Sequence, residues 1–237
     1  MFENNHLLVI VPHRGVNAGK SRLSPVLNDV SRGRLNRWLL ERTLRVVSTW
    51  LNDAQRCVVV SPCEVTLALA RKAGAIALPE NPDGHPQAHA AASGLNAALA
   101  QAAAHAASLG AQRLLILPCD LPRVDAAALE TMATLPEFGK SVIIAADRHG
   151  KGTNALLVDA SVRQFAFGQD SYARHIAQGE ARGVRTFQYR NETLAFDLDT
   201  AEDFAEWIDS GNVPPDLLAA LALTAPRRVE IISSRNK

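Results

Sequence analysis

Hydrophobic positions along the chain form short continuous runs that alternate with segments of helical periodicity. Residues 7–11 are five aliphatic residues followed by Pro12, a pattern typical of a strand buried on both faces of a sheet. Further runs predict strands at residues 57–60, 75–78, 114–117, 142–146, 154–158 and 193–199. Helical spacing or capping residues predict helices at residues 35–51, 64–73, 87–108 and 201–208, after Asp125, after Ser171 and from Pro214.

This alternation of strands and helices predicts an α/β fold with a mostly parallel sheet and helices on both of its faces. We expect one domain over residues 1–225, with residues 226–237 as an edge strand or a disordered tail. In such sheets ligands bind outside the carboxyl ends of the strands. The segments to inspect are therefore those that follow or border the predicted strands, at residues 12–23, 80–94 and 118–122 and around Gly152 and Asp197.

The loop after the first strand has the composition of a phosphate-binding loop. It contains Gly15 and Gly19, which free the backbone for a close approach, and the cations Arg14, Lys20 and Arg22. A P-loop needs glycine at position 14, so that pattern fails on its spacing. The loop predicts either a polyphosphate site of another kind or a surface loop with solvated cations.

Three aspartates are expected at the same edge of the sheet. Asp120 follows the strand at residues 114–117, and Asp197 and Asp199 lie two residues apart in an expected strand, so their side chains would share one face. Carboxylate oxygens hold Mg²⁺ against nucleotide phosphates, and clustered like charges favour a bridging cation. The alternative role of these residues is helix capping.

The capping alternative is weakened by better-placed neighbours. Asp125 is positioned to cap the helix that follows Asp120. Thr200 is expected to cap the helix at residues 201–208, with Glu202 or Asp203 completing a capping box. Both assignments leave the earlier aspartates for a metal ion.

Other polar segments suggest anion sites. Thr153 follows Gly152 just before a strand, and Gly168 and Ser171 precede a helix, whose N-terminus attracts anions. A plain turn or an N-cap would explain the same residues.

Gly94 lies inside the predicted helix at residues 87–108, where glycine costs about 1 kcal/mol relative to alanine. Close approach of a purine ring, or helix packing, would account for it.

Composition excludes several classes of protein. The net charge of +1 predicts no attraction to nucleic acid or to a membrane surface, and no apolar run has the length of about 18 residues that spans a bilayer. The polar first residues and the short run after them do not form a signal peptide, so a cytoplasmic location is expected. The three cysteines include no CxxC pair and are expected to be reduced thiols.

Taken in order, these motifs resemble the phospholactate guanylyltransferase family of coenzyme F-420 biosynthesis, over about residues 8–204. The residues that carry the resemblance are Val11-Pro12, Gly19-Lys20-Ser21-Arg22-Leu23, Gly94-Leu95-Asn96, Pro118-Cys119-Asp120-Leu121-Pro122, Gly152-Thr153-Asn154-Ala155-Leu156, Phe167-Gly168 with Ser171 and His175, and Asp197-Leu198-Asp199-Thr200. At the first strand's end, His13-Arg14 stands where the family usually has Val-Lys. Arg14 keeps the charge, but a planar guanidinium does not replace a lysine atom for atom.

The resemblance implies a Rossmann-like nucleotidyltransferase domain of the glycosyltransferase-A-like kind. It implies that GTP and a phosphorylated three-carbon acid (2-phospho-L-lactate, phosphoenolpyruvate or 3-phospho-D-glycerate) give a guanylylated product and pyrophosphate. The residues that it marks are Asp120, Asp197 and Asp199 for Mg²⁺; Arg14, Gly19, Lys20 and Arg22 for the GTP phosphates; Gly94 and Asn96 near the guanine; Thr153, Gly168 and Ser171 for the acid; and Lys20, Arg22 and Asp120 for catalysis.

Two other functions remain open from the sequence. A nucleotidyltransferase for another acceptor, such as the molybdenum cofactor or a sugar phosphate, shares the glycine-rich loop and the aspartate at a strand end. A non-catalytic nucleotide sensor could use the same fold, although a sensor has no need of three aspartates. The sequence does not identify the acid or the oligomeric state.

Overall fold

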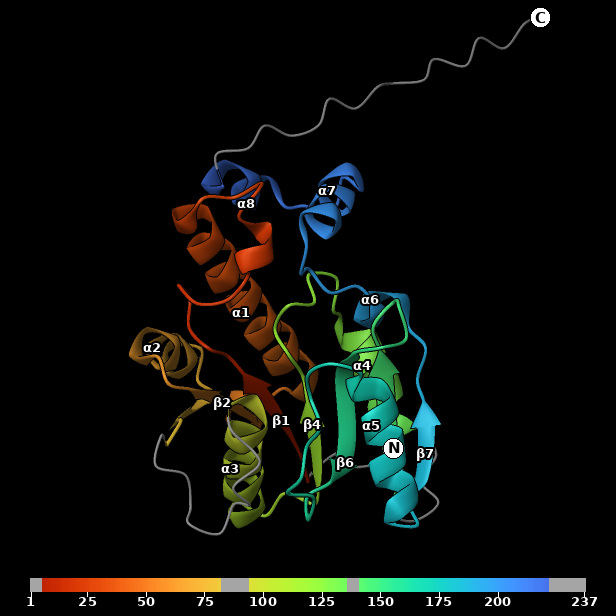
Figure 1. The fold of residues 1–237 in the computed structure, drawn as a ribbon. Coiled ribbons are helices and arrows are strands. Elements are labelled where there is room, and N and C mark those ends of the chain that lie inside the picture. Colours follow the sequence, from red (N-terminus) through yellow and green to blue (C-terminus); the bar gives the residue numbers. More distant parts are fainter. Residues whose placement is uncertain (1–5, 82–93, 136–140, 222–237) are drawn as a thin grey trace, which may run out of the picture.

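The computed structural model describes residues 6–81, 94–135 and 141–221. Within these residues, seven strands form one sheet in the order β3-β2-β1-β4-β6-β5-β7 (Figure 1). The strands are β1 (Leu7–Pro12), β2 (Cys57–Ser61), β3 (Ile76–Pro79), β4 (Arg113–Ile116), β5 (Ser141–Ala146), β6 (Thr153–Asp159) and β7 (Arg185–Gln188).

The sheet is mixed, because β6 runs antiparallel to both of its neighbours while the other pairs are parallel. The predicted mostly parallel sheet is therefore confirmed, with one reversed strand. Thr153, at the beginning of β6, pairs with Ala146 at the end of β5. The reversal thus brings the start of β6 to the edge where the neighbouring strands end.

Helices cover both faces of the sheet, as predicted. They are α1 (Asp29–Leu51), α2 (Glu64–Lys72), α3 (Leu95–Ser108), α4 (Ala126–Thr134), α5 (Ser171–Ala181), α6 (Glu192–Ala195), α7 (Ala201–Asp209) and α8 (Pro215–Ala220), with 3-10 turns η1 (Ser21–Leu23) and η2 (Ala54–Arg56). Alternate residues of β1 divide between two cores: Val9 packs with α1 and α4, and Ile10 packs with α3 and α5. In Figure 1, α3 and α5 lie on the same side of the sheet.

A third hydrophobic cluster lies beyond the edge of the sheet. It joins the first half of α1 to α7 and α8, with Leu35 and Trp207 among its buried members. The segment that leads into α7 contributes Phe196 and Leu198. This cluster fixes the chain around Asp197 and Asp199 against the start of α1.

Two expected helix caps are confirmed. Asp125 accepts a hydrogen bond from the backbone N–H of Ala128 at 2.8 Å, which starts α4. Thr200 caps α7 and forms a capping box with Asp203, which accepts from the backbone N–H of Thr200 at 2.7 Å. Asp203, rather than Glu202, is therefore the partner in the box.

The strand expected at residues 193–199 is wrong. Asn191 accepts hydrogen bonds from the backbone N–H groups of Thr193 and Leu194 and so caps the short helix α6. The chain after α6 then runs to α7 without regular structure. The edge strand β7 was not predicted from the sequence, and α1 begins six residues before the expected position 35, at Asp29.

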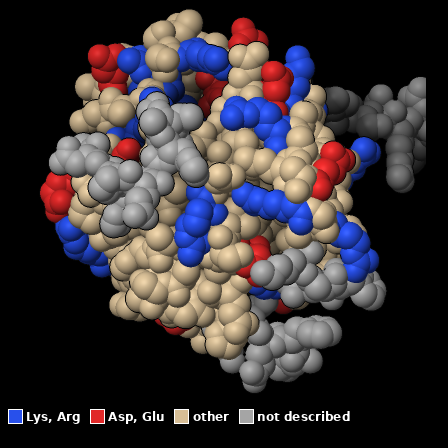
Figure 2. All heavy atoms as spheres, turned by 60° about the horizontal axis from the view of Figure 1, so that its bottom comes forward, with Lys and Arg blue, Asp and Glu red and all other residues tan. Residues whose placement is uncertain are grey.

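Parts of two expectations lie outside the described residues. Residues 87–93 of the expected helix at residues 87–108, and all of residues 226–237, lie outside the described residues. Gly94 is described and is the N-cap that precedes α3, with φ of 73°, so the expectation that it lies inside the helix is wrong. Among the described residues, no helix is both long enough and apolar enough to cross a membrane. On the face shown in Figure 2, basic and acidic side chains are interspersed among uncharged residues, as the net charge of +1 suggests.

Candidate active site

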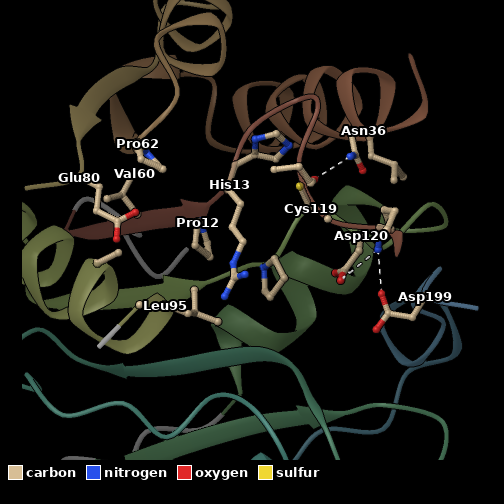
Figure 3. A pocket seen from close by; sticks show the side chains of 18 residues that line it. Pro12, His13, Asn36, Val60, Pro62, Glu80, Leu95, Cys119, Asp120 and Asp199 are labelled. Atoms are coloured by element: carbon tan, nitrogen blue, oxygen red, sulfur yellow. Dashed lines mark hydrogen bonds and ion pairs between the residues drawn. The ribbon is translucent and has the colours of Figure 1, made fainter. Parts of the chain in front are cut away.

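A cavity of about 540 Å³ opens at the carboxyl ends of β1 and β4 (Figure 3). Six residues that the sequence marked line it: Arg14, Gly19, Lys20, Gly94, Asp120 and Asp199. Leu95 and Glu80 approach from the side of α3 and β3, whereas Asp120 and Asp199 lie at the opposite side in Figure 3. The strand-end rule therefore located a real cavity, and it is lined by both cations and carboxylates.

The first loop is fastened to helix α1. Asn36 donates from its side-chain nitrogen to the backbone oxygens of Val16 at 3.2 Å and Ala18 at 3.0 Å. One turn earlier, Gly33 leaves room for Asn17, whose side-chain oxygen lies 2.8 Å from the position that a Cβ would take. A side chain at position 33 would displace the side chain of Asn17 from its place beside α1.

Lys20 leaves this loop in a left-handed backbone conformation, with φ of 55°, directly after Gly19 with φ of 82°. Its Nζ lies 2.9 Å from Oδ1 of Asp199 and 3.5 Å from Oδ2 of Asp120. Burial lowers the pKa of Lys20, but the two carboxylates outweigh burial and the pKa is raised. Lys20 is therefore a charged ammonium held between two carboxylates.

Asp197 lies near the same two carboxylates. Burial raises its pKa above the usual value, and the charges of Asp120 and Asp199 raise the pKa further. The backbone N–H of Leu198 donates to the backbone oxygen of Asp120 at 3.0 Å, which ties this segment to the chain that follows β4. The side-chain nitrogen of Asn154 lies 3.4 Å from Oδ1 of Asp197. Two carboxylates, those of Asp120 and Asp199, thus flank the ammonium of Lys20, and the third, that of Asp197, feels their negative charge.

The segment that carries these aspartates is clamped by arginines. Phe196 has the guanidinium of Arg123 3.8 Å from its ring centroid and that of Arg148 at 4.9 Å. Arg148 also forms an ion pair with Asp203, whose Oδ2 accepts from the backbone N–H of Asp199 at 2.9 Å. The position of Asp199 is therefore set by the capping box and by the stack around Phe196 together.

The donor chemistry of this cluster suits a magnesium ion, since carboxylate oxygens are its preferred protein ligands. The ammonium of Lys20 lies between two of the three carboxylates and acts as a stand-in cation. Within residues 6–81, 94–135 and 141–221, no group of three or more His, Cys, Asp and Glu side chains is already spaced to hold a metal ion. Metal binding by Asp120, Asp197 and Asp199 stays a prediction.

A second polar site surrounds the start of β6. Oγ1 of Thr153 lies 2.9 Å from Nδ1 of His175, and Nε2 of His175 accepts from the backbone N–H of Ala166 at 3.1 Å. Because Nε2 is an acceptor, the proton of the neutral ring is on Nδ1 and is donated to Thr153. The hydroxyl proton of Thr153 is then free to be donated to a ligand.

Gly168 and Ser171 complete this site at the start of α5. Gly168 has φ of 117°, a conformation that favours glycine, and accepts from the backbone N–H of Ser171 at 3.2 Å. Ser171 is 2% exposed. It lies one helical turn before His175, so both occupy the same face of α5. His175 therefore links Thr153 to the first turn of α5, and binding of an anion at this helix end stays a prediction.

Two predicted nucleotide contacts lie apart from the cavity lining. Arg22 is exposed on η1. The side-chain amide of Asn96 makes two hydrogen bonds with the backbone of Phe167. Neither residue is among those that line the 540 Å³ cavity. Their contacts with the nucleotide stay predictions.

Sequence reasoning missed the residues that support the site. Asn36 is buried among the leucines of α1, and Asn154 donates to the backbone oxygen of Leu194 at 2.9 Å. A polar side chain on an apolar helix face was the available signal for Asn36. The glycine at position 33 was a second one, because it marks close approach of another segment.

The first loop contains a buried histidine of the same kind as His175. Nδ1 of His13 accepts from the backbone N–H of Gly15 at 3.2 Å and lies 3.0 Å from Oγ1 of Thr66. Burial, with a contribution from Lys20, lowers the pKa of His13 to about 4, and burial, with Arg174 and Arg182, lowers that of His175 to about 4. Both rings are neutral in the folded protein at neutral pH.

These two histidines make the protein sensitive to acid. Each pKa is lower in the folded than in the unfolded chain, so their contribution to stability is complete above pH 6.5 and is lost as the pH falls toward 4. At about pH 5 we expect each histidine to cost on the order of 2 kcal/mol of unfolding free energy. Urea unfolding at a series of pH values measures this loss.

The matched variants are His175→Gln and His149→Gln, since His149 is exposed. The unfolding free energy of His175→Gln should change less between about pH 7.5 and about pH 5 than that of the wild type, and His149→Gln should keep the wild-type change. Equal slopes in all three proteins would contradict the assignment of a buried neutral His175.

Comparison with known proteins identifies relatives of most of the chain. A family model described as "Guanylyl transferase CofC like" matches residues 7–216. A phosphoenolpyruvate guanylyltransferase of Rubrobacter xylanophilus is 34% identical over 208 residues, covering 87% of this chain and 96% of that protein. A 2-phospho-L-lactate guanylyltransferase of Methanothermobacter thermautotrophicus is 29% identical over 203 residues, covering 86% of this chain and 84% of that protein.

The fold is shared with a solved structure as well. A nucleotidyl transferase from Methanothermobacter thermautotrophicus superposes with a TM-score of 0.59 at 18% identity, covering 87% of this chain and 97% of that one. At this identity the similarity concerns the fold alone. It agrees with the single α/β domain of the nucleotidyltransferase kind expected from the sequence.

Proposed function

Because this chain belongs to the CofC-like family of guanylyl transferases, we propose that it transfers GMP from GTP to the phosphate of a three-carbon phospho-acid and releases pyrophosphate. The names of the relatives support phosphoenolpyruvate or 2-phospho-L-lactate as the acid. Such a product belongs to coenzyme F-420 biosynthesis, the pathway of the family that the sequence resembles. The observation that carries the proposal is the ammonium of Lys20 between Asp120 and Asp199 at a cavity of about 540 Å³.

We assign GTP to this cavity. Arg14, Gly19 and Lys20 bring two cations and a flexible backbone to its wall, which suits a triphosphate. Gly94 and Leu95 line the opposite side, where a flat base finds an apolar surface without a Cβ at position 94. Arg22, on the adjacent turn η1, is assigned to the outer phosphates.

Asp120, Asp197 and Asp199 are the residues that would hold Mg²⁺. When bound, the ion neutralises phosphate charge and lowers the barrier for attack on phosphorus. Two observations support this assignment: the charges of Asp120 and Asp199 add to the effect of burial in raising the pKa of Asp197, and the ammonium of Lys20 lies between these same two carboxylates. Lys20 is then available to the triphosphate as the cation of the loop.

The acid is assigned to the site around Thr153, Gly168 and Ser171. The free hydroxyl proton of Thr153, the hydroxyl of Ser171 and the N-terminal end of α5 are all donors, and the carboxylate and phosphate of a phosphorylated acid offer acceptor oxygens. The two binding sites meet at the edge of the sheet, because the reversed strand β6 begins beside the ends of β4 and β5.

The proposed chemistry is direct transfer. A phosphate oxygen of the acid attacks the α-phosphorus of GTP in line, the bond from that phosphorus to the bridging oxygen breaks, and pyrophosphate leaves. The attacking phosphate is already anionic at neutral pH, so no strong general base is needed. Arg14 and Lys20 stabilise the charge that develops on the leaving group. No covalent guanylylated protein is expected, and trapping one with labelled GTP would refute direct transfer.

Pyrophosphate release with GTP and Mg²⁺ tests the proposal. Phosphoenolpyruvate, 2-phospho-L-lactate and 3-phospho-D-glycerate are supplied one at a time, and we expect one of the first two to give the highest kcat/KM. ATP, CTP and UTP in place of GTP should give lower turnover. A folded protein that binds GTP but is silent with all three acids would point to another acceptor or to a nucleotide sensor.

A further inference from the structure

The side chain of Asn96 is bound to the backbone of one residue, Phe167, in another segment. Its Nδ2 donates to the backbone oxygen of Phe167 at 3.0 Å, and its Oδ1 accepts from the backbone N–H of Phe167 at 2.9 Å. An amide side chain that makes both bonds to one residue holds that residue in position and in orientation. Both hydrogen bonds therefore go to the segment that contains Gly168 and Ser171, the residues assigned to the acid.

The held residue stands in the loop that binds the acid. Phe167 is 7% exposed, and its ring packs edge-on against His175 with the centroids 4.8 Å apart. His175 also accepts from the backbone N–H of Ala166, so the loop is held from the α5 side as well. Gly168, whose backbone and φ of 117° belong to the acid site, comes directly after Phe167.

The position of Asn96 in the chain adds a link to the other site. It lies in the first turn of α3, and the two residues before it, Gly94 and Leu95, line the cavity assigned to GTP. The start of α3 therefore lines the cavity assigned to GTP and also holds the loop assigned to the acid. The sequence had placed Asn96 near the guanine, whereas its side chain faces Phe167.

We propose that Asn96 is a positioning residue for the acid, acting through Phe167 and Gly168, and that it links the two substrate sites. This inference rests on the proposed function for its kinetic test. Without Asn96 the backbone N–H and the backbone oxygen of Phe167 lose these two hydrogen bonds. The loop that places Gly168 and Ser171 then becomes free to move. The binding of the acid weakens, while the cavity for GTP keeps its lining.

The test compares Asn96→Ala and Asn96→Asp with Gln101→Ala. Aspartate keeps an acceptor for the N–H of Phe167 but sets a second oxygen against the carbonyl of Phe167. Gln101 is a matched control on the same helix, since it donates to the oxygen of Pro79 at 2.9 Å and accepts from the N–H of Asn81 at 3.0 Å. Gln101→Ala removes a similar pair of bonds away from the acid loop.

For both Asn96 variants we expect the KM for the acid to rise by about tenfold or more, with the KM for GTP and the preference for guanine within about twofold of the wild type. Gln101→Ala should leave the KM for the acid unchanged. A rise in the KM for GTP, or a loss of base preference, with an unchanged KM for the acid would overturn the proposal and return Asn96 to the guanine. Equal changes in Asn96→Ala and Gln101→Ala would reduce its role to general stability.

A second measurement does not depend on turnover. Amide hydrogen exchange without substrates should speed up at residues 166–171 in Asn96→Ala and stay unchanged at residues 76–79. Unchanged exchange at residues 166–171 would overturn the positioning role whatever the enzyme catalyses. If exchange responds but the wild type releases no pyrophosphate with any acid, the proposed function fails and the link between Asn96 and the loop stands.

Discussion

The Asp120→Asn variant is expected to lose kcat by about a thousandfold or more while it stays folded. Asp120 follows β4 at the edge of the sheet, where its Oδ2 lies 3.5 Å from Nζ of Lys20. Asparagine has nearly the same shape but no charge, so it weakens both the predicted metal site and the field around Lys20. Loss of several kcal/mol of transition-state stabilisation corresponds to a loss of this size.

The fold should tolerate this change, because it removes one of the two negative charges that raise the pKa of Asp197. Pyrophosphate release measures kcat, and thermal unfolding checks the fold. Asp209→Asn is the matched control, since Asp209 is an exposed aspartate at the end of α7. Near-normal turnover of Asp120→Asn would refute its role in catalysis and in metal binding.

The Lys20→Met variant should lose both activity and stability, in contrast to Asp120→Asn. Methionine retains the length of the side chain but leaves Asp120 and Asp199 without their shared cation. We expect kcat/KM to fall by about 10²–10³, the range for removal of one donor to developing charge. The unfolding free energy should fall by about 1–2 kcal/mol, because Asp199 is 44% exposed and solvent screens part of the loss.

A double variant separates the two effects. Adding Asp199→Asn to Lys20→Met removes one of the two unpaired carboxylates, so stability should recover part of the way toward the wild type while activity stays low. Urea unfolding and pyrophosphate release are measured on the wild type, Lys20→Met, Asp199→Asn and the double variant, which together form a double-mutant cycle. A Lys20→Met protein that is as stable as the wild type would show that the ion pairs contribute nothing to the fold.

The strands were predictable wherever a buried strand leaves a continuous aliphatic run. Residues 7–11 are such a run, and β1 begins and ends within one residue of it. The edge strand β7 has exposed ends and polar residues, so no apolar run reveals it. Burial on both faces, rather than strand propensity, was the feature that the sequence displayed.

The wrong strand at residues 193–199 shows the limit of alternation. Leu194, Phe196 and Leu198 alternate and are all buried, as in a strand. They enter two different cores, however, and their backbone bonds go to separate partners, such as Asn154 for the oxygen of Leu194 and Asp120 for the N–H of Leu198. The alternation of apolar residues therefore indicated correctly which side chains are buried, although this segment pairs with no neighbouring strand among the described residues.

The site was predictable as far as its chemistry resides in charged residues at strand ends. Lys20, Asp120 and Asp199 were found in this way, and the structure brings them together. The supporting residues Asn36 and Asn154 bind backbone oxygens of distant segments. Their role depends on which carbonyl the fold places beside them, and no sequence pattern encodes that.

The two sets of assigned residues, on either side of the start of the reversed strand β6, also differ in how they are distributed along the sequence. Residues assigned to the nucleotide come from widely separated positions, such as Lys20, Gly94 and Asp120, whereas those assigned to the acid fall within one stretch, residues 153–171. Substitutions within residues 153–171 can therefore change the acceptor specificity while the residues assigned to GTP stay the same. Relatives with different acids can arise from one scaffold through changes in that stretch that keep the bonds between Asn96 and the backbone of residue 167.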